Sequence, residues 1–238
     1  MTPADRLRLA KGYPYRIERR SFRYVDGGAR PETRLHHADR VPVVAYGSNR
    51  SPEQLARKYA GWPVGTEIPV TLAWLADHDV VHSAHFARYG AVPAMLFPAA
   101  GVRVEVAVMW LTPPQLTRMH ETEGAANYAF GLQSGLDLRD EAGGRLETAG
   151  VYVGRHGALA RDTAPLPLAA VAAEGRRDRA GAQVDALTAA RDRLAPEAPL
   201  DRFILQNVTC PVTRADRSRR LRREALEPDR FAPKRCKP

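Results

Sequence analysis

The sequence contains few of the residues that form disulfide frameworks or zinc sites. It has two cysteines, Cys210 and Cys236, too few for either arrangement. It also lacks long apolar runs, and none approaches the ~20 residues that a helix needs to cross a bilayer. No apolar stretch follows Arg19 and Arg20, although a twin-arginine secretion signal would require one. These absences exclude a disulfide scaffold and a helical membrane protein, and they predict a cytoplasmic location.

The size and composition are those of a globular chain. Its 238 residues are 44% hydrophobic, which is enough for a core in one large domain or in one domain with extensions. We expect three parts: a basic N-terminal extension over residues 1–40, a main domain over residues 41–212, and a basic tail over residues 213–238.

The net charge of +9 belongs to the two ends of the chain. Residues 1–40 carry +5 and residues 213–238 carry +6, which leaves −2 for the residues between them. Basic ends are typical of proteins that bind nucleic acid or an anionic surface, but arginine-rich helices held by ion pairs have the same composition. Aromatic residues that stack on bases are sparse in the tail, so nucleic acid is the less favoured partner. Aromatic residues alternate with arginines between Tyr13 and Tyr24, a pattern that also fits a strand added to the main domain.

The hydrophobic pattern between the ends predicts antiparallel strands with a few attached helices, which is an α+β arrangement. Residues 102–110 alternate apolar and other residues and predict a half-buried strand. The glycine pair at 143–144 predicts a hairpin. Residues 166–195 are rich in alanine and predict a helix, and residues 213–227 predict a basic helix.

A turn between a strand and a helix stands out near residue 47. The apolar run Val41–Ala45 predicts a buried strand, and the sequence Ser-Pro-Glu-Gln at 51–54 predicts a capping box with proline at the first helical position. Gly47 and Ser48 then fall in the turn, where backbone N–H groups have no partner within the helix. The turn is either an anion or oxyanion site or an ordinary junction that uses glycine for its positive φ.

A second feature is a glutamate on the apolar side of a predicted helix. Thr112 and Gln115 predict a capping box, and Gly124 predicts the end of the helix. Between them, Met119 and Glu123 share one face. An acid in that position either escapes to water at the frayed helix end or lies in a cleft, where it can serve as a general acid and base.

The turn and the glutamate together resemble the gamma-glutamylcyclotransferase-like superfamily. Its members have Tyr-Gly-Ser-Asn after the first barrel strand and Glu-Gly at the end of a short helix, which match residues 46–49 and 123–124 here. The resemblance covers roughly residues 41–155 and implies a small mixed β-barrel with flanking helices. The chain differs from the family pattern at Arg50, where many members have an apolar residue, and at His120, where the family often has an aspartate.

The resemblance implies an enzyme that cyclises a γ-glutamyl group and releases 5-oxoproline with an amine or amino acid. Neither metal nor cofactor is implied. The resemblance assigns catalysis to Glu123 and substrate binding to Tyr46, Gly47, Ser48, Asn49 and Tyr128. The substrate stays open among glutathione, γ-glutamyl amino acids, γ-glutamylamines and γ-glutamyl biosynthetic intermediates.

One alternative of another class remains open, a binding or scaffold protein on the same fold that uses its basic ends, because a fold does not fix a function. His78, His82 and His85 lie close together in the sequence and are candidate metal ligands. In a strand these ligands would divide between two faces, and no cysteine or second histidine-rich segment completes a site, so we expect no metal.

Overall fold

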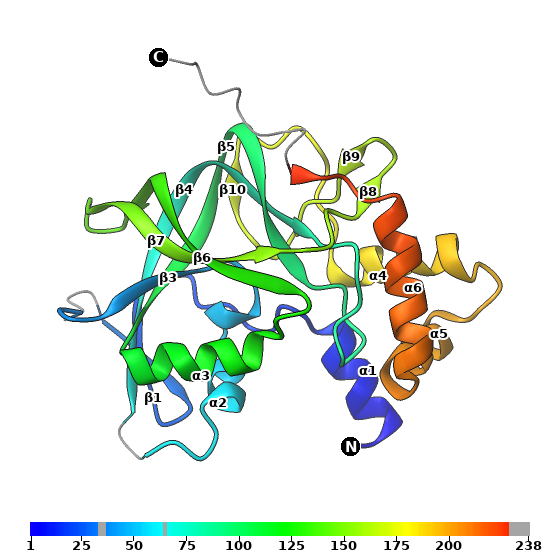
Figure 1. The fold of residues 1–238 in the computed structure, drawn as a ribbon, viewed down its shortest axis with the longest axis horizontal. Coiled ribbons are helices and arrows are strands. Elements are labelled where there is room, and N and C mark those ends of the chain that lie inside the picture. The colour runs from blue at the N-terminus through cyan, green and yellow to red at the C-terminus, as the bar shows by residue number, and fades with distance from the viewer. Residues whose placement is uncertain (33–36, 64–65, 229–238) are drawn as a thin grey trace.

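Five strands close into a barrel in the computed structural model, which describes residues 1–32, 37–63 and 66–228. The ring runs in the order β5, β3, β7, β6, β4, and β4 pairs again with β5 (Figure 1). Its strands are β3 (Val41–Ala45), β4 (Glu67–His82), β5 (Ala94–Leu111), β6 (Tyr128–Asp140) and β7 (Arg145–Gly154). With the helices around it, this barrel confirms the predicted α+β class and the small mixed barrel.

One neighbouring pair in the ring is parallel. β3 and β7 run in the same direction, with Val43 opposite Gly150, whereas the other neighbours are antiparallel. A ring with an odd number of strands cannot alternate direction all the way round, so at least one pair must be parallel. The expectation of purely antiparallel strands is therefore wrong at this seam.

Short strands extend the sheet outside the ring. β1 (Phe22–Val25) pairs with β4 and with β2 (Gly28–Pro31), as expected if the N-terminal arm adds a strand to the barrel. β10 (Ala173–Glu174) pairs with β5, while β8 (Ala160–Arg161) and β9 (Ala164–Pro165) pair with each other.

The helices form two groups. α2 (Pro52–Lys58) and α3 (Pro113–Glu123) lie together against one end of the barrel, and the short 3-10 turn η1 (Ser48–Arg50) precedes α2 (Figure 1). The second group lies at the side of the barrel and comprises α1 (Pro3–Lys11), α4 (Gln183–Leu194), α5 (Leu200–Thr209) and α6 (Pro211–Arg223). Among the described residues, no helix has both the length and the apolar character to span a membrane.

Apolar clusters occupy both faces of the barrel strands. Val43 and Ala45 of β3 pack in the cluster that meets α2 and α3, whereas Val44 belongs to the cluster on the other face. A third cluster lies within the second helical group, where Phe203 and Leu221 are buried. Residues from both predicted extensions thus take part in packing, and the boundaries at 41 and 212 stay predictions.

The structure corrects three expectations about individual elements. β5 is buried on both faces over its second half, because Ala107 and Met109 pack toward α2 and α3. Only residues 183–194 of the predicted helix 166–195 are helical, since Pro167 and the glycines at 175 and 181 interrupt the alanine-rich pattern. α1 was not predicted, although Thr2 and Asp5 form a capping box at its start.

Candidate active site

Glu123 ends α3 where the sequence pattern predicts the end. Thr112 and Gln115 form the predicted capping box, and Gly124 has a φ of 66°, which ends the helix. Met119, one turn earlier on the same face, is fully buried. The Glu123 side chain is 14% exposed, so it lies in the wall of a cavity and not in bulk water.

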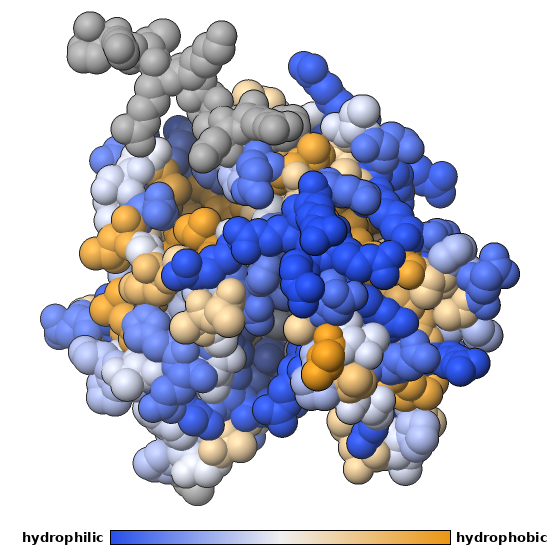
Figure 2. Space-filling model, turned by 45° about the vertical axis from the view of Figure 1, so that its right-hand side comes forward, coloured by the Kyte–Doolittle hydropathy of each residue, from blue (hydrophilic) through white to orange (hydrophobic). Residues whose placement is uncertain are grey.

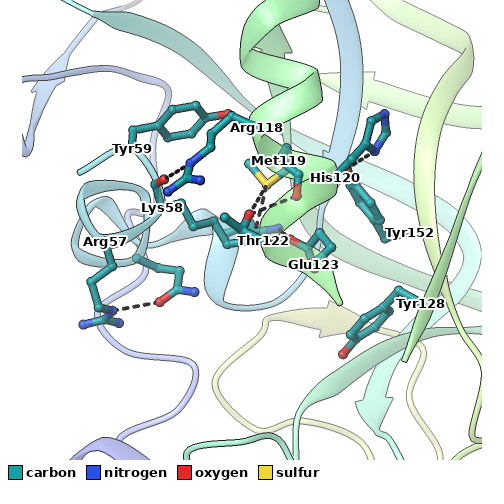
Figure 3. Close-up of polar contacts among 12 residues, drawn as sticks. Arg57, Lys58, Tyr59, Arg118, Met119, His120, Thr122, Glu123, Tyr128 and Tyr152 are labelled. Atoms are coloured by element: carbon teal, nitrogen blue, oxygen red, sulfur yellow. Dashed lines mark hydrogen bonds and ion pairs between the residues drawn. The ribbon is translucent and has the colours of Figure 1, made fainter. Parts of the chain in front are cut away.

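The Glu123 carboxylate is held through one of its two oxygens. Oε1 accepts a hydrogen bond from Asn49 Nδ2 at 2.6 Å and forms an ion pair with the ammonium of Lys58. Lys58 is nearly buried at the end of α2, and its ammonium also lies 3.3 Å from Met119 Sδ. Oε2 has no partner among the described residues. Figure 3 shows Glu123 at the end of α3, with Lys58 on one side and Tyr152 and Tyr128 on the other. One oxygen is therefore anchored while the other is available to a ligand.

The turn that carries Asn49 differs from its sequence-based prediction in two ways. Ser51 precedes α2 but its side chain makes no capping hydrogen bond, so the predicted capping box is absent. Gly47 has a φ of −120° and so does not use the positive φ region. A Cβ at Gly47 would instead lie 2.5 Å from the hydroxyl oxygen of Tyr13 and 3.3 Å from Ala94 Cβ. Glycine is required here because another side chain approaches the backbone closely.

That side chain, Tyr13, comes from the predicted N-terminal extension. Its hydroxyl oxygen accepts a hydrogen bond from the N–H of Ala94, at 2.8 Å. Burial raises the pKa of Tyr13, and the charge of Glu123 raises it further, so the hydroxyl stays protonated. No described residue accepts its hydrogen. The Tyr13 O–H is therefore a group left to donate beside the turn at Gly47 and Ser48.

One cavity of about 450 Å³ brings all six predicted site residues together. The rings of Tyr46 and Tyr128 form part of its wall, but their hydroxyls are already bound: Tyr46 donates to the Tyr152 carbonyl, and Tyr128 donates to the Ala94 carbonyl at 2.9 Å. The roles assigned to these residues stay predictions. The predicted residues that line the cavity are Tyr46, Gly47, Ser48, Asn49, Glu123 and Tyr128.

The tyrosines of the cavity wall are neutral. Burial is the main cause that raises the pKa values of Tyr46, Tyr128 and Tyr152, and the negative charge of Glu123 acts in the same direction. The cavity thus combines the charged groups of Lys58, Arg88, Glu121 and Glu123 with a wall of uncharged hydroxyls and rings. Such a wall suits a ligand with an apolar chain and a few polar ends.

Lys58 and Tyr13 are among the polar residues of this cavity that were not predicted from the sequence. The capping box predicted at 51–54 placed Lys58 on a helix without indicating what it faces. Tyr13 lies far outside the region that carries the resemblance, and its aromatic–arginine context indicated only a strand. Neither position had a sequence signal that joined it to Glu123, because both contacts are made through tertiary packing.

Arg50, the first departure from the family pattern, lies outside the cavity. Its side chain is fully buried, with Nη2 2.5 Å from Glu105 Oε1 and Nη1 donating to the Glu105 carbonyl at 2.9 Å. His120, the second departure, bonds through Nδ1 to the hydroxyl of Tyr152 at 2.8 Å. Neither Arg50 nor His120 lines the cavity, so neither adds a charge to its wall.

The histidine segment near residue 80 has partners other than a metal. The Asp79 carboxylate binds Arg176, with Arg176 Nη2 at 2.6 Å, and His82 Nε2 lies 3.1 Å from the Gly181 carbonyl. Within residues 1–32, 37–63 and 66–228, no group of three or more potential ligands is placed to hold a metal ion.

Comparison with known proteins adds little to this geometry. No protein-family model matches the chain, and no curated protein matches it. Among solved structures, the chain is similar to one described as "Gamma-glutamyl cyclotransferase", with a TM-score of 0.40 and 14% identity over 82% of this chain and 92% of that chain. A similarity at this level carries no inference about activity, which has to come from the site itself.

Proposed function

We propose that this chain is an enzyme that cyclises a γ-glutamyl group, releasing 5-oxoproline and a free amine. One observation carries the proposal: a glutamate with one anchored and one available oxygen shares a cavity with the turn at Gly47 and with a tyrosine hydroxyl. This set contains a base, a hydrogen-bond donor and room for a small flexible substrate. The sequence motifs at residues 46–49 and 123–124 suggest the same reaction.

The reaction needs one group to move a proton twice. Glu123 Oε2 takes a proton from the substrate's α-ammonium, and the freed amine attacks the γ-carbonyl carbon to close a five-membered ring. The amide C–N bond then breaks as Glu123 gives this proton to the leaving nitrogen. The second proton lost by the former α-ammonium passes from the ring nitrogen through Glu123 to the released amine, which departs as an ammonium. Atoms and charge balance without water, and one carboxylate serves as base and then as acid. The ammonium of Lys58 compensates the charge of Glu123 in the free enzyme.

The negative charge that develops on the carbonyl oxygen needs donors already in place. The Tyr13 hydroxyl suits this role, because its oxygen already accepts a hydrogen bond from the Ala94 N–H and its own hydrogen has no acceptor among the described residues. The Gly47 N–H, which has no protein acceptor in the described part of the chain, is the second candidate donor. The rings of Tyr46 and Tyr128 confine the glutamyl chain and so reduce the entropic cost of folding it into a ring.

The variant Glu123→Gln tests the proposal. Glutamine preserves the size of the side chain and a hydrogen bond but cannot take up the proton. We expect the variant to fold and to bind γ-glutamyl amides, while 5-oxoproline formation, measured by liquid chromatography, falls by roughly 10²- to 10⁴-fold. Glu147→Gln is the control, because Glu147 is an exposed glutamate on β7 that does not line the cavity.

Two outcomes would contradict the proposal. One is that the wild-type chain releases no 5-oxoproline from a panel of γ-glutamyl amino acids, γ-glutamylamines and glutathione. The other is that Glu123→Gln is as active as the wild type. In either case a binding protein on the same fold becomes the better hypothesis.

A further inference from the structure

A second cavity, of about 390 Å³, adjoins the first and is strongly basic. It lies between α6 and the segment that joins β4 to β5, and no acidic residue is among those that line it. Figure 2 shows hydrophilic side chains gathered across the middle of this side of the molecule. Its charged and polar lining residues are His85, Arg88, Asn127, His156, Arg214, Ser218, Arg219 and Arg222.

The arginines of this cavity are little used by the protein itself. Arg88 and Arg222 form no ion pair with a described residue, and Arg214 donates only to the Asn207 carbonyl, at 2.7 Å. Arg219 is paired with Asp216 at 3.2 Å, and both side chains are exposed. Guanidinium groups match the geometry of phosphate oxygens. Because two of these arginines are unpaired and a third binds only a carbonyl, several guanidinium N–H groups remain available to bind an anion.

A buried histidine joins the two cavities and has an unused nitrogen. His85 is 1% exposed, and its Nδ1 lies 2.9 Å from Ser83 Oγ. Its Nε2 is buried without a hydrogen-bond partner, which is costly unless a ligand satisfies it. The His85 ring stacks on His156 at 4.2 Å. His85, Arg88 and Asn127 line both cavities, so a ligand can extend from one into the other.

We infer that the second cavity binds a phosphate group carried by the amine half of the substrate. This inference rests on the proposed function, because the γ-glutamyl half would occupy the first cavity beside Glu123. The scissile amide would then lie between Glu123 and His85, with the leaving amine directed toward Arg88 and Arg222. Several arginines without a lining acid favour a doubly charged phosphate over a single carboxylate. The substrate class is thus a γ-glutamyl amide of a phosphorylated amine.

Two measurements on the full chain test this inference. Titration calorimetry with inorganic phosphate examines the site without any reaction. We expect saturable binding that weakens about tenfold or more in Arg88→Gln and in Arg222→Gln, since each removes a charge-assisted contact. Arg220→Gln is the matched control, because Arg220 lies on the same helix but does not line the cavity.

The second measurement compares 5-oxoproline release from two probes, γ-glutamyl-2-aminoethyl phosphate and γ-glutamylethanolamine. We expect the wild type to prefer the phosphate probe by about tenfold or more in kcat/KM. The double variant Arg214→Gln, Arg222→Gln, at two positions that line only the second cavity, should lose that preference while its kcat/KM for the ethanolamine probe stays the same.

The outcomes separate this inference from the proposed function. If the ethanolamine probe is cleaved and the phosphate probe is not preferred, the inference is overturned and the proposed function stands. If phosphate binds through Arg88 and Arg222 without such a preference, the cavity takes a free anion and the substrate assignment is wrong. If neither probe releases 5-oxoproline, the substrate assignment fails, the panel of γ-glutamyl compounds decides the proposed function, and calorimetry decides whether the anion site remains.

Discussion

At the residue scale, the most consequential contact is the ion pair between Lys58 and Glu123. Both side chains are largely buried, at 7% and 14% exposure. Removing one partner of such a pair leaves the other charge uncompensated, whereas removing both is much less costly. The pair therefore stabilises α2 against α3 only while both charges are present.

The variant Lys58→Met should destabilise the fold and reduce turnover together. We expect the free energy of unfolding in urea to fall by about 3 kcal/mol, because Glu123 stays buried without its cation. The double variant Lys58→Met, Glu123→Gln should recover much of that loss. Lys11→Met is the control, since Lys11 forms an ion pair with Asp201 at a more exposed site. Equal stability of the single and double variants would contradict this account.

Tyr13 allows a second prediction at this scale. Tyr13→Phe retains the ring and removes the hydroxyl that we place beside the carbonyl oxygen. Loss of one such donor typically lowers kcat by roughly 10²- to 10³-fold, and KM should change far less. Tyr15→Phe is the control, because Tyr15 is a neighbouring tyrosine that does not line the cavity. A kcat within a factor of about two of the wild type would remove Tyr13 from the mechanism.

At the element scale, the sequence predicted correctly some of the elements that have a recognisable capping or turn signal at their ends. The capping box at Thr112 and the glycine at 124 defined α3, and the glycine pair at 143–144 marked the β6–β7 hairpin. For residues 166–182 the alanine-rich composition predicted a helix that is absent, because proline and glycine disfavour a helix more than alanine favours it. The direction of β3 relative to β7 depends on barrel closure, which no local pattern encodes.

A buried ion pair fixes the turn η1 to the barrel. The sequence indicated only that Arg50 departs from the family pattern. Arg50 binds both the carboxylate and the carbonyl of Glu105 on β5. Because Asn49 is the residue before it, this contact also positions the amide that holds Glu123.

Breaking this pair should therefore affect stability first and activity second. We expect Arg50→Met to lower the free energy of unfolding by about 3–5 kcal/mol, because Glu105 is left buried and unpaired. Arg50→Met with Glu105→Leu should be markedly less destabilised than the sum of the two single variants, as measured by a double-mutant cycle in urea. Additive single effects would show that the pair does not act as a unit.

At the scale of the whole molecule, the residues of the first cavity are largely separated along the chain from α4, α5 and α6. The residues that line the first cavity lie between 13 and 152, and the resemblance that pointed to them covers most of this span. In the layer of α1, α4, α5 and α6, the sequence predicted helices that overlap α4 and α6 but did not predict α1 or the packing of the layer. Its helices are held by contacts distant in sequence, such as Arg217 with the Phe203 carbonyl at 3.1 Å, and no periodicity of a single segment reveals such contacts.

This separation predicts that stability and activity can be uncoupled through α6. Leu221 is 2% exposed in the third apolar cluster, so Leu221→Ala should lower the free energy of unfolding by about 2–5 kcal/mol. Val212→Ala, at a position that is 78% exposed on the same helix, should change it little. With γ-glutamylethanolamine as substrate, and at a temperature where the variant remains folded by circular dichroism, kcat/KM should match the wild type, because no residue of α6 lines the first cavity. A loss of kcat/KM in the folded Leu221→Ala variant would mean that the helical layer shapes the site as well as supporting it.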